Sequence, residues 1–143
     1  MAASILKTNV NTKSPEFEKN TRRMIDLVTQ IKNEEEQIAV GGGAKAIEAQ
    51  HKKGRLTARE RIAKLIDPGS QFFELGVYAA YEMYEEWGGA PSAGTITGIA
   101  RVCKRTFMII ANDATVKAGA FFPMTAKKVI RAQIGRASCR ERV

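Results

Sequence analysis

The strongest constraint on the fold of this sequence is a pair of adjacent apolar segments with the composition of β-strands. Residues Thr95–Val102 are rich in β-branched side chains with rough alternation, and residues Thr106–Ala111 are mainly apolar. The polar trio Cys103–Arg105 between them predicts a hairpin turn. A third, short strand is predicted at Phe72–Leu75. Because two or three strands give apolar side chains little to pack against, we expect the chain to hold only the beginning of a larger sheet.

A long amphipathic helix is predicted ahead of these strands. Ser14 can cap the free amides of a helix, and Pro15 suits the first helical position. The three glycines Gly41–Gly43 should end it, because ordering glycine loses much backbone entropy. Between Pro15 and these glycines, apolar residues recur at helical spacing: Phe17, Met24, Leu27, Val28, Ile31 and Ile38.

Two shorter helices are predicted next, one over Ala44–Lys53 and one that begins after Thr57. Thr57 and Glu60 have the spacing of a capping box, in which each side chain bonds to the other residue's amide. Ile62, Leu65 and Ile66 are predicted to form the buried stripe of this helix. Asp67–Ser70 contains Pro68 and Gly69 and should end it.

The segments around the strands are less regular. The aromatic-rich residues Val77–Trp87 predict no definite structure, and Gly88–Gly94 has the composition of a flexible loop. A last helix is predicted from about Thr125, after Pro123. Helices, then strands, a loop and another helix together favour the α/β fold class.

Composition narrows the classes of protein that this chain can belong to. Hydrophobic residues make up 44% and charged residues 27% of the 143, which excludes wholesale disorder. No apolar stretch approaches the ~18 residues of a membrane span, so no membrane partner is expected. The two cysteines cannot form a disulfide framework, and Met1–Thr12 lacks the apolar core of a signal peptide. We therefore expect a cytoplasmic or equivalent compartment.

The net charge of +8 directs attention to anionic partners. The main electrostatic feature is a basic cluster whose members can form a solvated helix face, a phosphate-binding surface or a nucleic-acid surface. No aromatic residues interleave with it as they do in many nucleic-acid interfaces. The basic cluster consists of Lys52, Lys53, Arg55, Arg59, Arg61 and Lys64.

Three other features give weak functional signals. His51 is the only histidine and has no ligand partners at metal-binding spacing, so no metal site is expected. Cys103 lacks a second cysteine or a histidine at a catalytic spacing and is interpreted as incidental. Gly41–Gly43 follows a helix and lacks the spacing of a phosphate-binding loop, which favours a hinge.

The most suggestive segment follows the second long strand. It ends in Ala118, Gly119 and Ala120, which are small enough for a ligand to lie against the backbone. Main-chain amides there could stabilise a carbonyl oxygen that becomes an oxyanion, and Lys117 could meet a phosphate. No other catalytic group is assigned. The alternative is a tight strand-to-helix crossover without a ligand, and spacing alone leaves both open.

Several sequence blocks follow one another in a specific order. They are GGGAKAI at residues 41–47, QHKKGRLTARERI at 50–62, LIDPGS at 65–70, GTITGI at 94–99 and IIANDATVKAGA at 109–120. The order of these blocks resembles one family, the carboxyltransferase (beta) subunits of biotin-dependent acyl-CoA carboxylases. The sequence of the last block is closest to the methylcrotonoyl-CoA branch, and the resemblance covers about Val40 to Gln133.

This resemblance implies a crotonase-like superhelical α/β fold, of which the chain would hold only the front part. It implies that acyl-CoA and carboxybiotin meet at a dimer interface of a beta-subunit oligomer. A separate alpha subunit would carboxylate biotin with ATP and bicarbonate, in the mitochondrial matrix if the source is eukaryotic. The same resemblance places Lys117, Ala118 and Gly119 near CoA and suggests Arg55 and Arg59 as contacts for CoA phosphates.

The resemblance also suggests a division of the chain. Residues 1–40 would be a helical extension that could dock on the alpha subunit, and residues 41–133 the front of the acyl-CoA-binding domain. Residues 134–143 resemble the translation of a sequencing-library adapter, so we expect them to be non-native and not to continue the preceding helix. The chain alone is expected to be inactive. The alternative is a small basic nucleic-acid-binding or subunit-interaction module without catalysis.

Overall fold

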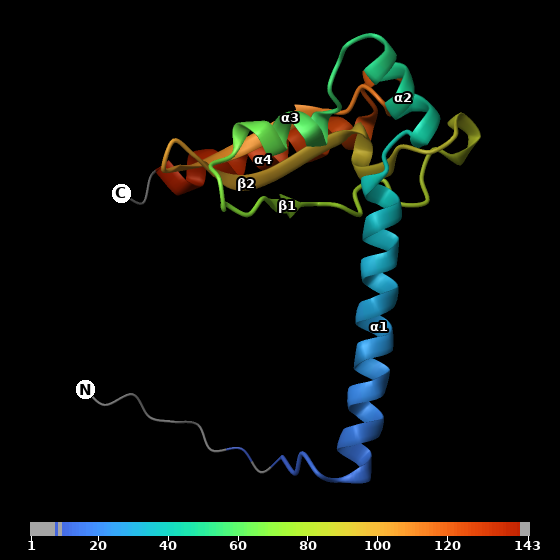
Figure 1. Ribbon diagram of the computed structural model, residues 1–143, viewed down its shortest axis with the longest axis vertical. Helices are drawn as coiled ribbons and strands as arrows, with labels where there is room; N and C mark the ends of the chain where they lie inside the picture. Colours follow the sequence, from blue (N-terminus) through green and yellow to red (C-terminus); the bar gives the residue numbers. More distant parts are fainter. Residues whose placement is uncertain (1–7, 9, 141–143) are drawn as a thin grey trace. The chain divides into compact units, whose positions relative to one another are not determined.

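The computed structural model describes residue 8 and residues 10–140, and the chain divides into two compact units between Glu34 and Glu35 (Figure 1). Helix α1 spans Pro15–Ala39 and begins as predicted, with Ser14 Oγ accepting the Phe17 amide at 3.2 Å. Most of the apolar stripe of α1 is exposed, Phe17 is half-buried, and Ile38 is the one buried residue of the helix. None of the helices in the described part of the chain is long and apolar enough to cross a membrane.

Helices α2 and α3 follow, over Ala44–Lys52 and Ala58–Leu65. The predicted capping box of α3 is confirmed: Thr57 Oγ1 accepts the Glu60 amide at 3.3 Å, and Glu60 Oε2 accepts the Thr57 amide at 2.7 Å. The predicted buried stripe is wrong at Leu65, which is 52% exposed. Ile62 and Ile66, four residues apart, share the face that packs on the core, and Leu65 lies beside that face.

The sheet contains three antiparallel strands in the order β1-β2-β3. Strand β1 spans Phe73–Leu75, β2 spans Thr95–Val102 and β3 spans Arg105–Asn112. Side chains alternate between the two faces of this sheet, because successive residues of a strand point to opposite sides. One face packs on α3, and the buried residues of the core between them are Ala58 and Ile62 of the helix and Ile96, Ala100 and Ile109 of the sheet.

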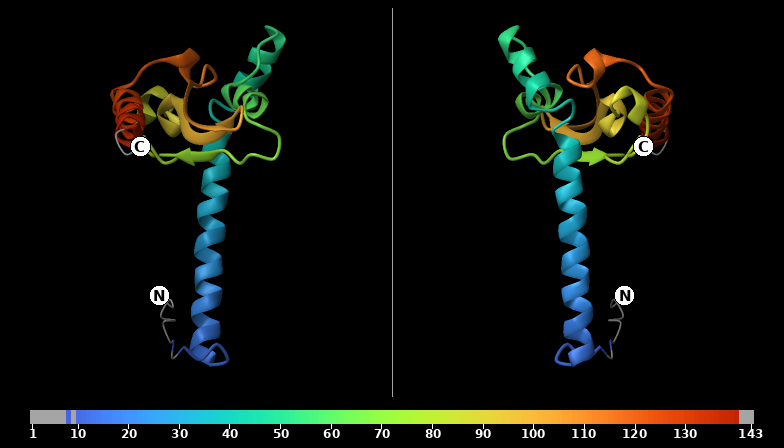
Figure 2. Two further views of the ribbon diagram at one scale, coloured as in Figure 1. Left: turned by 90° about the vertical axis from the view of Figure 1, so that its left-hand side faces the viewer. Right: turned by 90° about the vertical axis from the view of Figure 1, so that its right-hand side faces the viewer.

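Helix α4, Pro123–Arg140, covers the other face of the sheet, as the two views of Figure 2 show. Its predicted start near Thr125 is confirmed to within two residues. The expectation that residues 134–143 do not continue this helix is wrong as far as Arg140. The local reason is that residues 134–140 contain no proline, and only Gly135 among them has a markedly low helix propensity.

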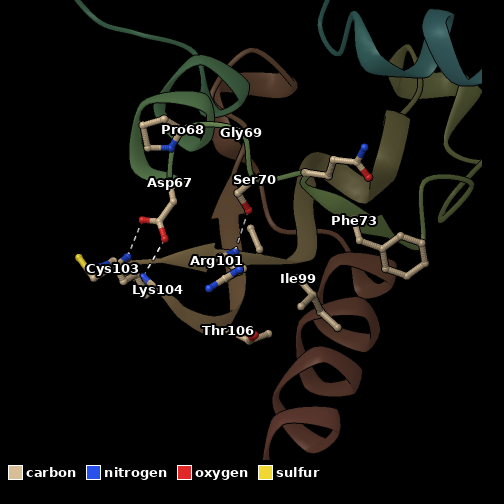
Figure 3. Close-up of a pocket in the computed structure, with 12 residues that line it drawn as sticks. Asp67, Pro68, Gly69, Ser70, Phe73, Ile99, Arg101, Cys103, Lys104 and Thr106 are labelled. Atoms are coloured by element: carbon tan, nitrogen blue, oxygen red, sulfur yellow. Dashed lines mark hydrogen bonds between the residues drawn. The ribbon is translucent and has the colours of Figure 1, made fainter.

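The hairpin turn between β2 and β3 is made by Cys103 and Lys104, with φ of 50° and 64°. Both residues are left-handed, as a two-residue type I′ turn requires, so Arg105 belongs to the strand and not to the turn. The Asp67 carboxylate accepts both turn amides at 2.7 Å (Figure 3). Because it holds these two amides, the Asp67 carboxylate already has a structural role. Asp67 is also the only acidic residue among the described residues that line the pocket drawn in Figure 3.

The prediction of a flexible loop at Gly88–Gly94 is wrong for most of that segment. The 3-10 helix η1, Glu85–Trp87, ends just before it, the 3-10 helix η2, Pro91–Gly94, makes up its second half, and Ala93 is fully buried. Small residues gave the segment a loop-like composition, but here they let the backbone pack closely between α4 and the start of β2.

Candidate functional site

The small-residue turn suggested by the sequence lies between β3 and α4 and contains the single 3-10 turn η3, Lys117–Gly119. The φ angles of Lys117, Ala118 and Gly119 are 47°, 57° and 85°. A left-handed conformation costs about 1–2 kcal/mol for a residue with a Cβ. Two such residues in succession therefore have to be held in place by the structure around them.

The backbone amides of this turn differ in availability. Gly119 donates to Val116 O at 2.8 Å and Ala120 donates to Lys117 O at 3.0 Å. By contrast, no atom of residues 8 and 10–140 accepts a hydrogen bond from the amides of Lys117 and Ala118. Lys117 and Ala118 are both exposed. The turn therefore presents two adjacent free donors, and the Lys117 amide is one that sequence reasoning missed.

The side chain of Lys117 extends toward the loop that precedes β2. A Cβ placed on Gly88 would lie 2.6 Å from Lys117 Nζ, so the absence of a side chain at Gly88 leaves space for the ammonium group. The neighbouring Trp87 stacks on Tyr84 with ring centroids 6.3 Å apart, and Tyr84 lies 4.9 Å from Phe122. This aromatic cluster was not predicted, although Tyr84 and Trp87 lie in the segment whose structure the sequence left undefined.

The two arginines suggested as phosphate contacts have different surroundings. Arg59 forms a two-point ion pair with Glu74, with Nη1–Oε2 at 2.6 Å and Nη2–Oε1 at 3.0 Å. Arg55 is exposed and makes no ion pair with the described residues. Within that part of the chain, no hydrogen bond or ion pair joins either arginine to Lys117. Of the two, Arg55 therefore has the charge that is free for a ligand.

His51 is part of the surface around the capping box of α3. Its Nε2 lies 2.9 Å from Glu60 Oε1. The hydrogen bond from the Thr57 amide, followed by the contact with His51, holds the pKa of the Glu60 carboxyl below its usual value. Across residues 8 and 10–140, no three His, Cys, Asp or Glu side chains gather in a way that could hold a metal ion.

A buried lysine on α4 was not identified from the sequence. Lys128 Nζ donates to Ser92 O at 3.0 Å, to Ser92 Oγ at 2.6 Å and to Thr95 O at 2.7 Å. Burial lowers the pKa of Lys128 to about 8, with Glu74 acting in the opposite direction. Its three acceptors show that Lys128 fastens η2 and the start of β2 to α4.

Comparison with known proteins identifies the family. The family model described as "Carboxyl transferase domain" matches residues 49–143. The chain is 45% identical over 131 residues to the probable methylcrotonoyl-CoA carboxylase beta chain, mitochondrial, of Drosophila melanogaster. It is 46% identical over 120 residues to the biotin-dependent 3-methylcrotonyl-coenzyme A carboxylase beta1 subunit of Mycobacterium tuberculosis. These alignments include 92% and 84% of this chain, and 22% of each relative. The chain belongs to the carboxyl transferase family.

Solved structures give the same result for the fold. The beta subunit of geranyl-CoA carboxylase from P. aeruginosa matches with a TM-score of 0.77 and 27% identity, over 90% of this chain and 24% of that one. Transcarboxylase 12S, described as a hexamer with methylmalonyl-coenzyme A bound, matches with a TM-score of 0.67 and 30% identity, over 73% of this chain and 21% of that one. The predicted crotonase-like α/β class is confirmed. The chain spans about a fifth of the length of the curated relatives named above.

Proposed function

We propose that this chain binds an acyl-CoA thioester at the turn Lys117–Ala120, as part of an enzyme that transfers a carboxyl group from carboxybiotin to acyl-CoA. A methylcrotonoyl-CoA-like substrate is favoured by the relatives named above. One observation carries the proposal: the turn is largely exposed, has no side chain beyond Cβ at residues 118–120, and presents the amides of Lys117 and Ala118, which have no acceptor among the described residues. A flat thioester can therefore approach the backbone closely.

The chemistry of the reaction explains why such amides are useful. Removal of a proton from the carbon that will be carboxylated moves negative charge onto the thioester oxygen. Backbone donors fixed in advance stabilise that charge without reorganising. Ala118 is the donor we assign to this oxygen, with the Lys117 amide beside it. The Lys117 ammonium and the exposed guanidinium of Arg55 are available for the phosphates of CoA.

The remaining groups of the reaction are expected to come from outside these residues. Biotin supplies the activated carboxyl group when it is bound, and we assign it to a partner subunit that uses ATP and bicarbonate. No residue of this chain is assigned to hold biotin. A homo-oligomer is proposed by analogy with the hexamer of transcarboxylase 12S. A mitochondrial compartment is proposed for a eukaryotic source, by analogy with the Drosophila melanogaster relative.

The sequence-based division of the chain is retained as part of this proposal. Residues 1–40 would be an extension, residues 41–133 the front of the acyl-CoA-binding domain, and residues 134–143 a non-native tail. The chain alone is proposed to be inactive in a carboxyl-transfer assay with a carboxybiotin donor. Measurable turnover by the purified chain would contradict that statement.

The second candidate, a basic nucleic-acid-binding or subunit-interaction module, gains no support from the relatives named above. Two of the six charges of the basic cluster are already paired: Lys52 with Glu48 at 2.8 Å, and Arg59 with Glu74. A nucleic-acid surface would need these cations for phosphates. Titration with RNA at increasing salt separates the two functions, because phosphate binding weakens steeply as salt rises.

The binding proposal is tested by titrating this chain with acetyl-CoA and following ¹⁵N-labelled amides. We expect the Ala118 amide to shift with acetyl-CoA and to shift less with CoA thiol, which lacks the carbonyl oxygen. Replacing one phosphate-binding cation, Lys117→Gln, is expected to weaken both ligands by about tenfold, since a hydrogen bond to a charged group is worth about 1.5–3 kcal/mol. Lys104→Gln is the matched control, because Lys104 is an exposed, left-handed lysine at the hairpin turn. Equal effects of the two substitutions would contradict the site.

A further inference from the structure

The triple glycine after α1 is packed against the segment that leads into the candidate site. The Gly42 amide donates to Thr115 Oγ1 at 3.1 Å. A Cβ added to Gly42 would lie 1.8 Å from the Thr115 carbonyl oxygen and 2.4 Å from its carbonyl carbon. Both atoms belong to the main chain and cannot turn away as a flexible side chain could. The close approach of these two backbones therefore depends on the absence of a side chain at residue 42.

The need for glycine at this position is one of space and not of conformation. Gly41 and Gly43 have φ of 62° and 87°, but Gly42 is not among the residues with positive φ. An alanine at residue 42 would therefore meet the Thr115 backbone without an intrinsic φ penalty. This makes Gly42 a clean test of the contact, and it shows that the triple glycine does more than act as a free hinge.

Thr115 is itself held firmly. Its amide and its hydroxyl both donate to Asp113 Oδ1, at 2.9 Å and 2.6 Å. The Asp113 amide donates to Gly94 O at 2.9 Å, which joins this turn to the start of β2. Asp113 and Thr115 are both buried. A displacement of the Thr115 main chain would therefore break a buried set of hydrogen bonds or move it as a whole.

The same backbone continues directly into the candidate site. Val116 is 2% exposed, its amide donates to Asp113 O at 3.1 Å, and its carbonyl accepts the Gly119 amide at 2.8 Å. The left-handed pair Lys117 and Ala118 lies between the two ends of that last hydrogen bond. The positions of Thr115 and Val116 thus determine where the Ala118 amide points.

We propose that Gly42 is a positioning residue: by seating the Asp113–Thr115 turn against the glycine backbone, it fixes the Ala118 amide where the thioester oxygen of an acyl-CoA would lie. The consequence for ligand binding rests on the proposed function. The positional effect itself does not, because it concerns only contacts within residues 41–119.

The experiment compares Gly42→Ala with Gly135→Ala in the full 143-residue chain. Gly135 is the matched control, because it lies in α4 without a positive φ and has no described heavy atom within 4 Å of an added Cβ. We expect Gly42→Ala to change the chemical shift and hydrogen-exchange rate of the Ala118 amide without any ligand, and Gly135→Ala to leave both unchanged. An unmoved Ala118 amide in a folded Gly42→Ala chain would overturn the proposal.

Ligand binding then distinguishes positioning from a general loss of structure. We expect Gly42→Ala to reduce the preference for acetyl-CoA over CoA thiol by about fivefold, the value of one hydrogen bond of about 1 kcal/mol. Binding of CoA thiol through Lys117 should change less. Equal weakening of both ligands would overturn the positioning role, since it would indicate general structural damage.

A second pair of variants keeps the test decisive if Gly42→Ala does not fold. Thr115→Ser retains the hydroxyl that accepts the Gly42 amide, and Thr115→Val removes it at similar volume. We expect Thr115→Ser to keep the Ala118 shift and the acetyl-CoA preference, and Thr115→Val to lose both. Identical behaviour of these two variants would overturn the proposal. If the unsubstituted chain binds no CoA, and the Gly42→Ala substitution still changes the Ala118 amide, the proposed function alone would be overturned.

Discussion

The guanidinium of Arg59 donates two hydrogen bonds, of 2.6 Å and 3.0 Å, to the carboxylate of Glu74 and so connects α3 to β1. The side chains are 31% and 14% exposed, so the pair lies at the edge of the core. Bidentate pairs of this kind are stronger than single contacts because the planar groups match in geometry. The Arg59 charge, suggested from the sequence as a phosphate contact, thus has a structural partner.

Loss of this ion pair is predicted to destabilise the chain. Glu74→Gln removes the negative charge while keeping the side-chain shape, and we expect the free energy of unfolding to fall by about 1.5 kcal/mol, as for a hydrogen bond to a charged group. Urea denaturation measures this change. Glu48→Gln is the matched control, because the Glu48–Lys52 pair is 64% and 74% exposed and should contribute less than about 0.5 kcal/mol. Equal losses would show that Glu74 contributes no more than a surface charge.

The buried ammonium of Lys128 predicts a specific pH dependence. Burial lowers its folded pKa from 10.5 to about 8, against the opposing attraction of Glu74 and with a small further decrease from Arg59. Between these two values the unfolded chain binds more protons than the folded one, so stability contributed by this group rises with pH. Below pH 8 both states are protonated, and the full cost of burying the charge is present.

This dependence is isolated by comparison with Lys128→Met, which fills similar space and cannot titrate. The variant removes one donor from each of the carbonyls of Ser92 and Thr95, which keep the Thr95 amide and the more distant Ser92 hydroxyl. Because buried hydrogen bonds are lost, we expect it to be less stable at every pH. The difference in melting temperature between the original chain and the variant should grow from pH 7.5 to pH 10. A difference that shrinks over this range would show that the charged form is not penalised in the fold.

The hairpin turn offers a stabilising substitution. Lys104 has φ of 64°, which favours glycine. Its backbone amide donates to Asp67 Oδ2, and a glycine at this position would keep that hydrogen bond. We expect Lys104→Gly to stabilise the chain by about 0.5–1 kcal/mol by relieving the left-handed strain. Lys64→Gly, in the last turn of α3, should have the opposite sign because glycine weakens a helix by about 1 kcal/mol. Thermal denaturation of the two variants provides the comparison.

Removal of residues 134–143 is predicted to leave the rest of the fold intact. Ile134 is 63% exposed, whereas Ala132 and Lys128 earlier in α4 are buried. A chain that ends at Gln133 should therefore melt within about 2 °C of the original, less than the shift that about 1 kcal/mol produces in a domain of this size. A chain that ends at Ala126 loses Lys128 and should melt much earlier. A large loss from the first truncation would assign these ten residues a structural role.

Local features of this fold could be read from the sequence with good accuracy. The capping box at Thr57 and Glu60, the end of α1 before Gly41 and the span of β2 each depend on residues within a few positions of one another. The candidate turn at residues 117–120 was also found, because a run of small residues after an apolar strand is itself a local pattern. The availability of its individual amides could not be found in that way.

Burial was harder to predict than secondary structure. The segment Gly88–Gly94 has the composition of a loop but lies partly in the core, and Lys128 reads as one of many surface lysines. Each error has the same origin: the partners of these residues lie elsewhere in the chain, with Lys128 and Ser92 separated by 36 positions. Composition within a short window contains no record of such partners.

The sequence by itself determined the family and the order of the helices and strands, because these depend on motifs and hydrophobic spacing along the chain. Only the tertiary structure decided which charges and amides remain available. Arg59 is paired with Glu74, the amides of Gly119 and Ala120 donate to nearby carbonyls, and the Ala118 amide has no acceptor in the part of the chain that the structure describes. The physical reason is that a donor or acceptor can bond only to the groups that the packed backbone brings within reach. Contacts across the fold, such as that of Gly42 with Thr115, determine which groups these are.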